Sequence, residues 1–216
     1  TSQGAVIGSA VVATALPARR ANSHKGDYGS LGIIGGAPGM VGAALLAGRA
    51  ALNLGAGRVY VGLLAADNAG YDPVQPELML RTVVEVLKLD HLNCLAVGPG
   101  LGQSPDAHHV LAAALRANLP LVLDADALNL IAFDAGLQQL VSQRTAATIL
   151  TPHPAEAARL LASTTASVQA DRVAAACAIA ARYHCLVALK GAGTICALPD
   201  GAWFINTSGN PGMASA

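Results

Sequence analysis

The amino-acid sequence predicts an α/β fold in which helices cover both faces of a mainly parallel sheet. Short runs rich in leucine and β-branched residues alternate with alanine-rich runs, which is the order that successive β-α units produce. The runs LGII (31–34) and LVL (121–123) show no polar alternation, as expected of strands that are covered on both faces. The strand-like runs lie within 30–36, 58–64, 94–102, 120–129 and 147–153, and the helix-like runs lie within 42–57, 104–118 and 154–162.

Two helix boundaries can be assigned from local chemistry. Ser104 is suited to cap a helix, Pro105 fits its first position, and Asp106 complements the positive end of the helix dipole. Gly55 is suited to terminate the preceding helix, because glycine adopts the left-handed conformation found just after helix ends.

The apolar opening, residues 4–20, has roughly the length of a signal-peptide core. Its basic residues, Arg19 and Arg20, follow the apolar run instead of preceding it, and the run is shorter than the ~20 residues that span a bilayer. We therefore expect a first helix packed on the domain.

The composition favours one compact domain over residues 1–216 that binds small molecules. Hydrophobic residues make up 53% of the chain and charged residues 12%, and no repeat or linker interrupts it. Thirteen basic and thirteen acidic side chains balance, which argues against a nucleic-acid or anionic-membrane surface. The four cysteines form no C-x-x-C pair and no cluster with histidine, so we expect no disulfide framework, no zinc site and a cytoplasmic location.

Unusual residues follow four of the predicted strands. In sheets of this kind, ligands bind beyond the carboxyl ends of the strands. The residues are Gly35, Gly36, Gly39 and Gly42; Gly98, Gly100 and Gly102; Asp124, Asp126 and Asn129; and His153 and Glu156.

Each of these groups also has a purely structural interpretation. The segment GGAPGMVG (35–42) is more typical of a tight turn than of a dinucleotide fingerprint, since no acidic partner follows the next strand. In DADALN (124–129), one aspartate is suited to cap the next helix, while two carboxylates and an amide could also hold a sugar hydroxyl or a hydrated metal ion. In TPHPAE (151–156), proline can start a helix with Glu156 near its positive end, and His153 is as suited to a structural as to a functional role.

The segment ALKGAGTICAL (188–198) predicts a hairpin whose turn requires glycine. Lys190 adds a cation at the turn, and the backbone N–H groups of such a turn can face a phosphate. The segment does not have the order of a Walker loop, so a nucleotide here would be bound by another architecture.

Taken together, seven ordered motifs resemble the ADP/ATP-dependent NAD(P)H-hydrate dehydratases of the ribokinase-like superfamily. The resemblance runs from about residue 22 to 216 and implies a three-layer α/β/α sandwich. The motifs are HKGDYGSLGIIGG (24–36), GAALLAGRAALNLGAGRV (42–59), GPGLGQ (98–103), LDADALN (123–129), TPHPAEAARLL (151–161), LKGAGT (189–194) and NPGMAS (210–215).

The resemblance implies a lyase that repairs nicotinamide nucleotides: it dehydrates the S epimer of hydrated NADH or NADPH and consumes ATP or ADP, with Mg²⁺. The implied substrate-binding residues are Ala43, Gly100, Gly102, Asp126, Asn129 and His153. The implied nucleotide-binding residues are Lys190, Gly191, Ala192, Gly193 and Thr194. Glu156 is the implied Mg²⁺ ligand, and Asp126 and Asn129 would organise Mg²⁺ and water with it. Ala155 stands where the family commonly has glycine, which affects the fine geometry of that turn. Relatives commonly assemble as tetramers, so a homo-oligomer is expected.

In the family, a G-x-G-D motif that carries the catalytic aspartate and an anion hole follows NPGMAS. The sequence ends at Ala216, before that motif, so we expect a C-terminally incomplete domain that is inactive alone and leaves apolar sheet surface uncovered. If the ending is native, the chain would be a nucleotide-binding module without catalysis. A ribokinase-like small-molecule kinase is the other alternative, because fold alone does not separate it from a dehydratase.

Overall fold

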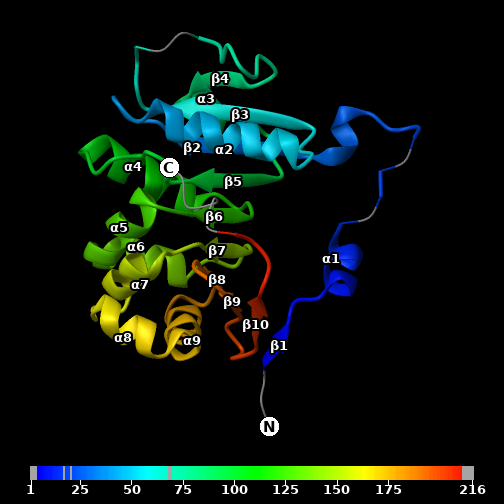
Figure 1. The fold of residues 1–216 in the computed structure, drawn as a ribbon. Helices are drawn as coiled ribbons and strands as arrows, with labels where there is room; N and C mark the ends of the chain where they lie inside the picture. The colour runs from blue at the N-terminus through cyan, green and yellow to red at the C-terminus, as the bar shows by residue number, and fades with distance from the viewer. Residues whose placement is uncertain (1–3, 17, 20, 68–69, 211–216) are drawn as a thin grey trace.

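The computed structural model describes residues 4–16, 18–19, 21–67 and 70–210 (Figure 1). Arg20, which was used in the argument about a signal peptide, and residues 211–215 of the last family motif lie outside the described residues.

The central element is a ten-stranded sheet in the order β1-β10-β9-β8-β7-β6-β5-β2-β3-β4. Within the described ranges, only β9 runs antiparallel to its neighbours, so the predicted mainly parallel sheet is confirmed. The strands are β1 (Gly4–Val6), β2 (Ser30–Gly35), β3 (Arg58–Leu63), β4 (Met79–Thr82), β5 (Cys94–Val97), β6 (Leu121–Leu123), β7 (Thr148–Leu150), β8 (Leu186–Leu189), β9 (Thr194–Ala197) and β10 (Trp203–Asn206).

Helices lie on both faces of this sheet. Helix α2 packs against β2 and β3, where Ala44 joins a small core with Ile33, Val59 and Val61. The opposite face carries the main core, to which α3 to α9 contribute. The helices are α1 (Ser9–Ala15), α2 (Val41–Asn53), α3 (Val83–Leu87), α4 (Pro105–Arg116), α5 (Asp126–Phe133), α6 (Ala135–Ser142), α7 (Pro154–Leu160), α8 (Thr165–Ala170) and α9 (Arg172–Tyr183), with a 3-10 turn η1 at Lys25–Tyr28.

Both predicted helix boundaries are confirmed. Ser104 Oγ accepts a hydrogen bond from the N–H of Ala107 at 3.1 Å, and Pro105 is the first residue of α4. Gly55 follows the end of α2 with φ +106°, a conformation that costs glycine little.

The expectation for the N-terminal segment is wrong. A helix forms at α1, but none of its residues is buried, and Val11, Val12 and Leu16 are exposed. In Figure 1 this segment runs apart from the main body after β1 pairs with β10. The apolar composition favoured the expectation of a packed helix, but a helical sequence does not supply a packing partner, and no residue of α1 is buried. No helix among the described residues is long and apolar enough to span a bilayer.

The face of the sheet that carries α2 is covered only in part. Beyond β2 and β3, apolar side chains that share this face of the sheet are partly exposed on β5 to β10. Among the described helices, α2 is the one whose side chains join the core on this face. These side chains are Ala96, Val122, Ile149, Leu186, Ala188, Cys196 and Phe204.

A buried ion pair anchors the connection between β3 and β4 to α2. Asp72 is fully buried and accepts hydrogen bonds from Arg49 Nε and Nη2, both at 2.7 Å, and from the N–H of Val74 at 2.9 Å. The hydrogen bonds from Arg49 lower the pKa of Asp72 from 3.8 to about 2. The ionised form of Asp72 is therefore the form that the fold stabilises.

This pKa shift predicts an acid-sensitive contribution to stability. Because the pKa is lower in the folded than in the unfolded chain, the contribution is complete above about pH 4 and is lost as the pH falls toward 2. Asp72→Asn should lower the free energy of unfolding at neutral pH and flatten its dependence on pH in that window. Urea denaturation at several pH values measures both effects. Asp67→Asn, an exposed change in the same connection, is the matched control, and an equal pH dependence in the two variants would contradict the assignment.

Candidate functional site

The predicted loops meet along the carboxyl edge of the sheet. The N–H of Gly36 donates to the carbonyl of Pro99 at 3.1 Å, and the N–H of Ala37 donates to the carbonyl of Gly100 at 2.6 Å. These bonds join the segment after β2 to the segment after β5. A Cβ on Gly98 would lie 1.8 Å from the carbonyl oxygen of Asp124, so the segment after β6 also packs directly against them. The backbones of the segments after β2, β5 and β6 therefore pack side by side and form one continuous wall.

Gly100 brings this wall against the start of α2. It has φ +59°, and a Cβ there would lie 2.5 Å from the carbonyl oxygen of Met40 and 3.1 Å from Cβ of Ala43. Only glycine permits this approach without displacing α2. The structure thus brings together Ala43 and Gly100, two of the residues that the sequence assigns to the substrate.

The third residue of the glycine motif contacts DADALN. The N–H of Gly102 donates to Asp126 Oδ2 at 2.9 Å. Between the two aspartates, Ala125 has φ +50° and ψ −117°, a strained conformation for a residue with a side chain. This bend directs Asp126 to Gly102 and Asp124 to Lys190, and such strain is characteristic of functional sites.

The structural interpretation in which one of these aspartates caps the next helix is wrong. Helix α5 has Ala125 at its N-cap and no side-chain hydrogen bond there. The reason is that each carboxylate has a partner outside the helix. Asn129 is also directed elsewhere, since its Oδ1 accepts a hydrogen bond from Arg159 Nη1 at 2.9 Å on α7.

Lys190 lies between two carboxylates. Its Nζ is 2.6 Å from Asp124 Oδ1 and 3.9 Å from Glu156 Oε2. Glu156 is 4% exposed, whereas the lysine side chain is 42% exposed. Two carboxylates therefore hold a partly accessible cation: Asp124, which lies 66 residues away in the chain, and Glu156, which is buried.

His153 has a structural role that the sequence left open. Its Nδ1 accepts hydrogen bonds from the N–H groups of Ala155 and Glu156 at 3.1 and 3.4 Å, so it caps α7. Glu156 Oε2 in turn accepts from the N–H of His153 at 2.8 Å, which completes a capping box. Because Nδ1 accepts, we assign the ring proton to Nε2, which lies 3.2 Å from Glu156 Oε1. The side chain remains 47% exposed.

The predicted hairpin is confirmed, and its turn is open to solvent. Strands β8 and β9 pair antiparallel, and Gly191 and Gly193 have φ +143° and +66°. Among the described groups, none accepts a hydrogen bond from the N–H of Gly191, Ala192 or Gly193. Free N–H groups in a glycine turn beside a lysine suit an anion.

The carbonyl groups of this turn are held by Arg172, a residue that sequence reasoning missed. Arg172 Nη2 donates to the carbonyls of Leu189, Lys190 and Gly193 at 3.2 to 3.3 Å. It begins α9, and no local pattern connects it with the hairpin.

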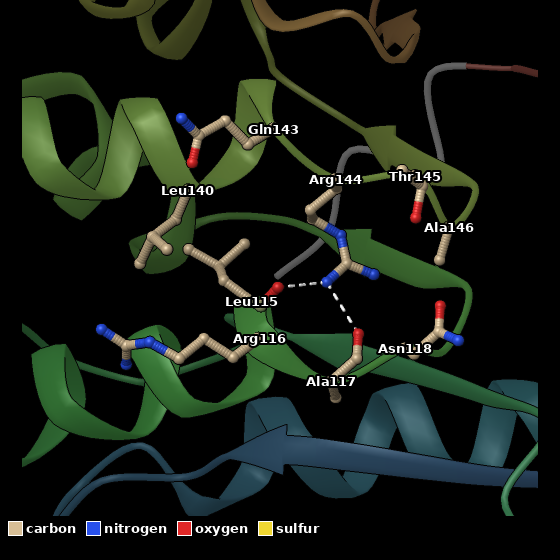
Figure 2. Close-up of a pocket in the computed structure, with 9 residues that line it drawn as sticks. All are labelled: Leu115, Arg116, Ala117, Asn118, Leu140, Gln143, Arg144, Thr145 and Ala146. Carbon is tan, nitrogen blue, oxygen red and sulfur yellow. Dashed lines mark hydrogen bonds between the residues drawn. The ribbon is translucent and has the colours of Figure 1, made fainter.

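A separate cavity of about 360 Å³ lies away from these loops, between the end of α4 and the segment before β7 (Figure 2). Arg144 extends into it and donates from Nε to Thr148 Oγ1 at 2.8 Å, from Nη1 to the carbonyls of Leu115 and Ala117, and from Nη2 to that of Leu119 at 2.5 Å. Burial lowers the pKa of Arg144. Because all three guanidinium nitrogens hold the chain, Arg144 has a structural role.

Residues 31–216 match the family model for NAD(P)H-hydrate dehydratase, which is most of the chain. The chain belongs to the NAD(P)H-hydrate dehydratase family. An ADP-dependent (S)-NAD(P)H-hydrate dehydratase of Neisseria meningitidis is 46% identical over 206 residues, which cover 92% of the chain and 68% of that protein. The chain spans 40% of a bifunctional NAD(P)H-hydrate repair enzyme of Moorella thermoacetica, at 40% identity over 93% of its own length.

Solved structures agree with this family. An ADP/ATP-dependent NAD(P)H-hydrate dehydratase from Bacillus subtilis, co-crystallised with ATP/Mg²⁺, has a TM-score of 0.79 and 32% identity over 96% of the chain and 74% of its own. A ribokinase-like superfamily protein from Enterococcus faecalis has a TM-score of 0.82 and 25% identity over 100% of the chain and 76% of its own. The ribokinase-like fold that the motifs imply is confirmed.

Proposed function

We propose that the chain is the dehydratase domain of an ADP/ATP-dependent (S)-NAD(P)H-hydrate dehydratase, a hydro-lyase that restores NADH or NADPH from the hydrated form. The observation that carries the proposal is the continuous wall from α2 to the hairpin. Ala43 and Gly100, two of the residues assigned to the substrate, lie at one end of it. The lysine and the open glycine turn assigned to the nucleotide lie at the other.

The chemistry requires such an arrangement. Hydroxide is a poor leaving group from the reduced nicotinamide ring, whereas phosphate departs readily, and the ring nitrogen can supply the electrons for elimination. The protein must therefore place the substrate hydroxyl beside the terminal phosphate of the nucleotide and stabilise the transferred charge. In our proposal, Lys190 and the N–H groups of residues 191–193 stabilise the phosphates. Gly100 lets the start of α2, with Ala43, pack against the glycine segment, and Gly102 directs its N–H to Asp126.

Mg²⁺ is proposed to enter with the nucleotide. Among the described residues, no group of three or more histidine, cysteine or acidic side chains is arranged to hold a metal ion. Mg²⁺ commonly needs only one or two carboxylates when phosphates supply other ligands. Glu156 and Asp124 fit this requirement by chemistry, and the single positive charge of Lys190, which lies beside both, offsets only one of their two negative charges. The role of Glu156 as a Mg²⁺ ligand stays a prediction, and so does a homo-oligomeric assembly.

Calorimetry and product analysis test the proposal. The chain should bind ATP or ADP, and it should bind hydrated NADH with an affinity that unmodified NADH does not match. Recovery of NADH absorbance from its hydrate with ATP and Mg²⁺ would extend binding to catalysis. Binding of ATP without binding of the hydrate, together with a stable phosphorylated product of another alcohol, would instead identify a small-molecule kinase.

His153 caps α7 and is also assigned to the substrate, and one substitution can separate these two roles. His153→Asn keeps an acceptor for the N–H groups of α7, because asparagine is a good N-cap, but it removes the imidazole. If His153 contacts the substrate, the variant should melt close to the unsubstituted chain and lose affinity for hydrated NADH more than for ATP. Calorimetry with both ligands measures the difference.

His153→Ala is the companion variant. It should lose the cap as well, at a cost of about 1 kcal/mol in the free energy of unfolding. If His153→Asn binds hydrated NADH as tightly as the unsubstituted chain does, His153 is a helix cap and not a substrate ligand.

A further inference from the structure

We propose that Arg172 is a positioning residue for the nucleotide: it holds the 190–194 turn in the shape that presents its N–H groups to a phosphate. This inference rests on the proposed nucleotide site. It concerns a residue outside that turn, at the start of α9.

The contacts of Arg172 span the turn. Its Nη2 reaches the carbonyl oxygen of Leu189 at 3.2 Å, before the turn, and that of Gly193 at 3.3 Å, near its end. The carbonyl of Lys190 lies between them, also at 3.3 Å. One guanidinium nitrogen is thus within hydrogen-bonding distance of three carbonyl oxygens, from both sides of the turn. Nη1 packs so close to Gly191 that a Cβ there would lie 2.4 Å away.

Peptide geometry converts these contacts into an orientation of the N–H groups. In a trans peptide, the C=O and the N–H point in opposite directions. Because the Lys190 carbonyl points to Arg172, the N–H of Gly191 in the same peptide points away from it. The same reasoning applies to the Leu189 carbonyl and the N–H of Lys190, which donates to the carbonyl of Pro152 at 2.8 Å. Arg172 therefore fixes a donor at Gly191 that has no acceptor among the described residues and is exposed.

The positive charge of Arg172 adds to this effect without requiring contact with the ligand. Its Nη2 is engaged by the three carbonyls, and its Nη1 by Gln169 Oε1 at 3.4 Å. A donor group held in advance of binding costs no reorganisation when the phosphate arrives. Loss of Arg172 should therefore weaken nucleotide binding while the substrate side of the site is unchanged.

Arg182 offers a matched control at the other end of the same helix. Its Nη1 donates to the carbonyl of Leu160 at 2.9 Å, and its Nη2 donates to Gln138 Oε1 at 3.0 Å. It has the same chemistry and the same kind of partners as Arg172, but it contacts no residue of the turn. If the substitutions acted only through a general loss of stability, changing Arg172 and changing Arg182 should weaken ATP binding equally.

The experiment compares Arg172→Gln, Arg172→Lys and Arg182→Gln with the unsubstituted chain. ATP and hydrated NADH affinities are measured by calorimetry, and amide hydrogen exchange is followed in the ligand-free peptide that contains residues 190–194. Arg172→Gln should raise the dissociation constant for ATP roughly tenfold, leave that for hydrated NADH unchanged, and accelerate exchange in the turn. Arg172→Lys, which keeps the charge but not the fork, should show the same pattern and decides the matter if Arg172→Gln does not fold.

Three results would overturn the inference. One is unchanged ATP affinity in the Arg172 variants, and another is an equal loss in Arg182→Gln at equal melting temperature. The third is weakened ATP binding without faster exchange, which would identify Arg172 as a direct phosphate ligand. If the unsubstituted chain does not bind ATP, the proposed function fails instead, and the exchange measurement still reports whether Arg172 holds the turn.

Discussion

Lys190→Ala is expected to raise the dissociation constants for ATP and ADP roughly 10- to 100-fold. The substitution removes a charge-assisted contact with phosphate, and contacts of that kind contribute about 1.5 to 3 kcal/mol. It also leaves Asp124 and Glu156 without their cation, so the surroundings of residue 190 become more negative and repel the nucleotide. Calorimetric titration with each nucleotide measures the effect.

Lys88→Ala is the control for the loss of one positive charge. Lys88 is exposed at the end of α3, so this variant should bind nucleotides as the unsubstituted chain does. The affinity for hydrated NADH should change less than that for ATP in Lys190→Ala. Unchanged ATP and ADP affinities would reject the phosphate role of Lys190 and leave it as a partner for buried and half-buried carboxylates.

Gly100→Ala is expected to abolish measurable binding of hydrated NADH and to lower the free energy of unfolding by roughly 2 to 4 kcal/mol. Two costs add: a residue with a side chain at φ +59° is strained, and its Cβ would collide with the carbonyl of Met40. Relief of the collision requires α2 to move, and Ala43 moves with it. The change should therefore affect the substrate end of the wall more than the nucleotide end.

Gly39→Ala separates these two costs. Gly39 has φ +80°, but a Cβ there would meet no atom within 4 Å, so only the backbone strain of about 1 to 2 kcal/mol is expected. Urea denaturation and calorimetry with hydrated NADH should show a large difference between the two variants. Similar stability and similar substrate affinity in both would show that the contact between Gly100 and α2 is not needed.

The local features of this protein could be predicted from the sequence because they depend on residues within a few positions of one another. The cap at Ser104, the stop at Gly55 and the hairpin around Gly191 are confirmed by the structure. Glycine and polar residues after successive strands indicated which edge of the sheet carries the site, since parallel strands place their carboxyl ends together. The motifs also indicated the family, which the match over residues 31–216 confirms.

Only the tertiary structure decided the partners of these residues. Asp124 accepts a hydrogen bond from Lys190, 66 positions later, instead of capping a helix. Asn129 accepts a hydrogen bond from Arg159 on a neighbouring helix. Arg172 holds a turn that begins 18 residues further on, while none of the residues of helix α1 is buried. The physical reason is range: helix caps and turns are decided by bonds between near neighbours, whereas the choice of a distant partner depends on how the whole sheet brings its strands together.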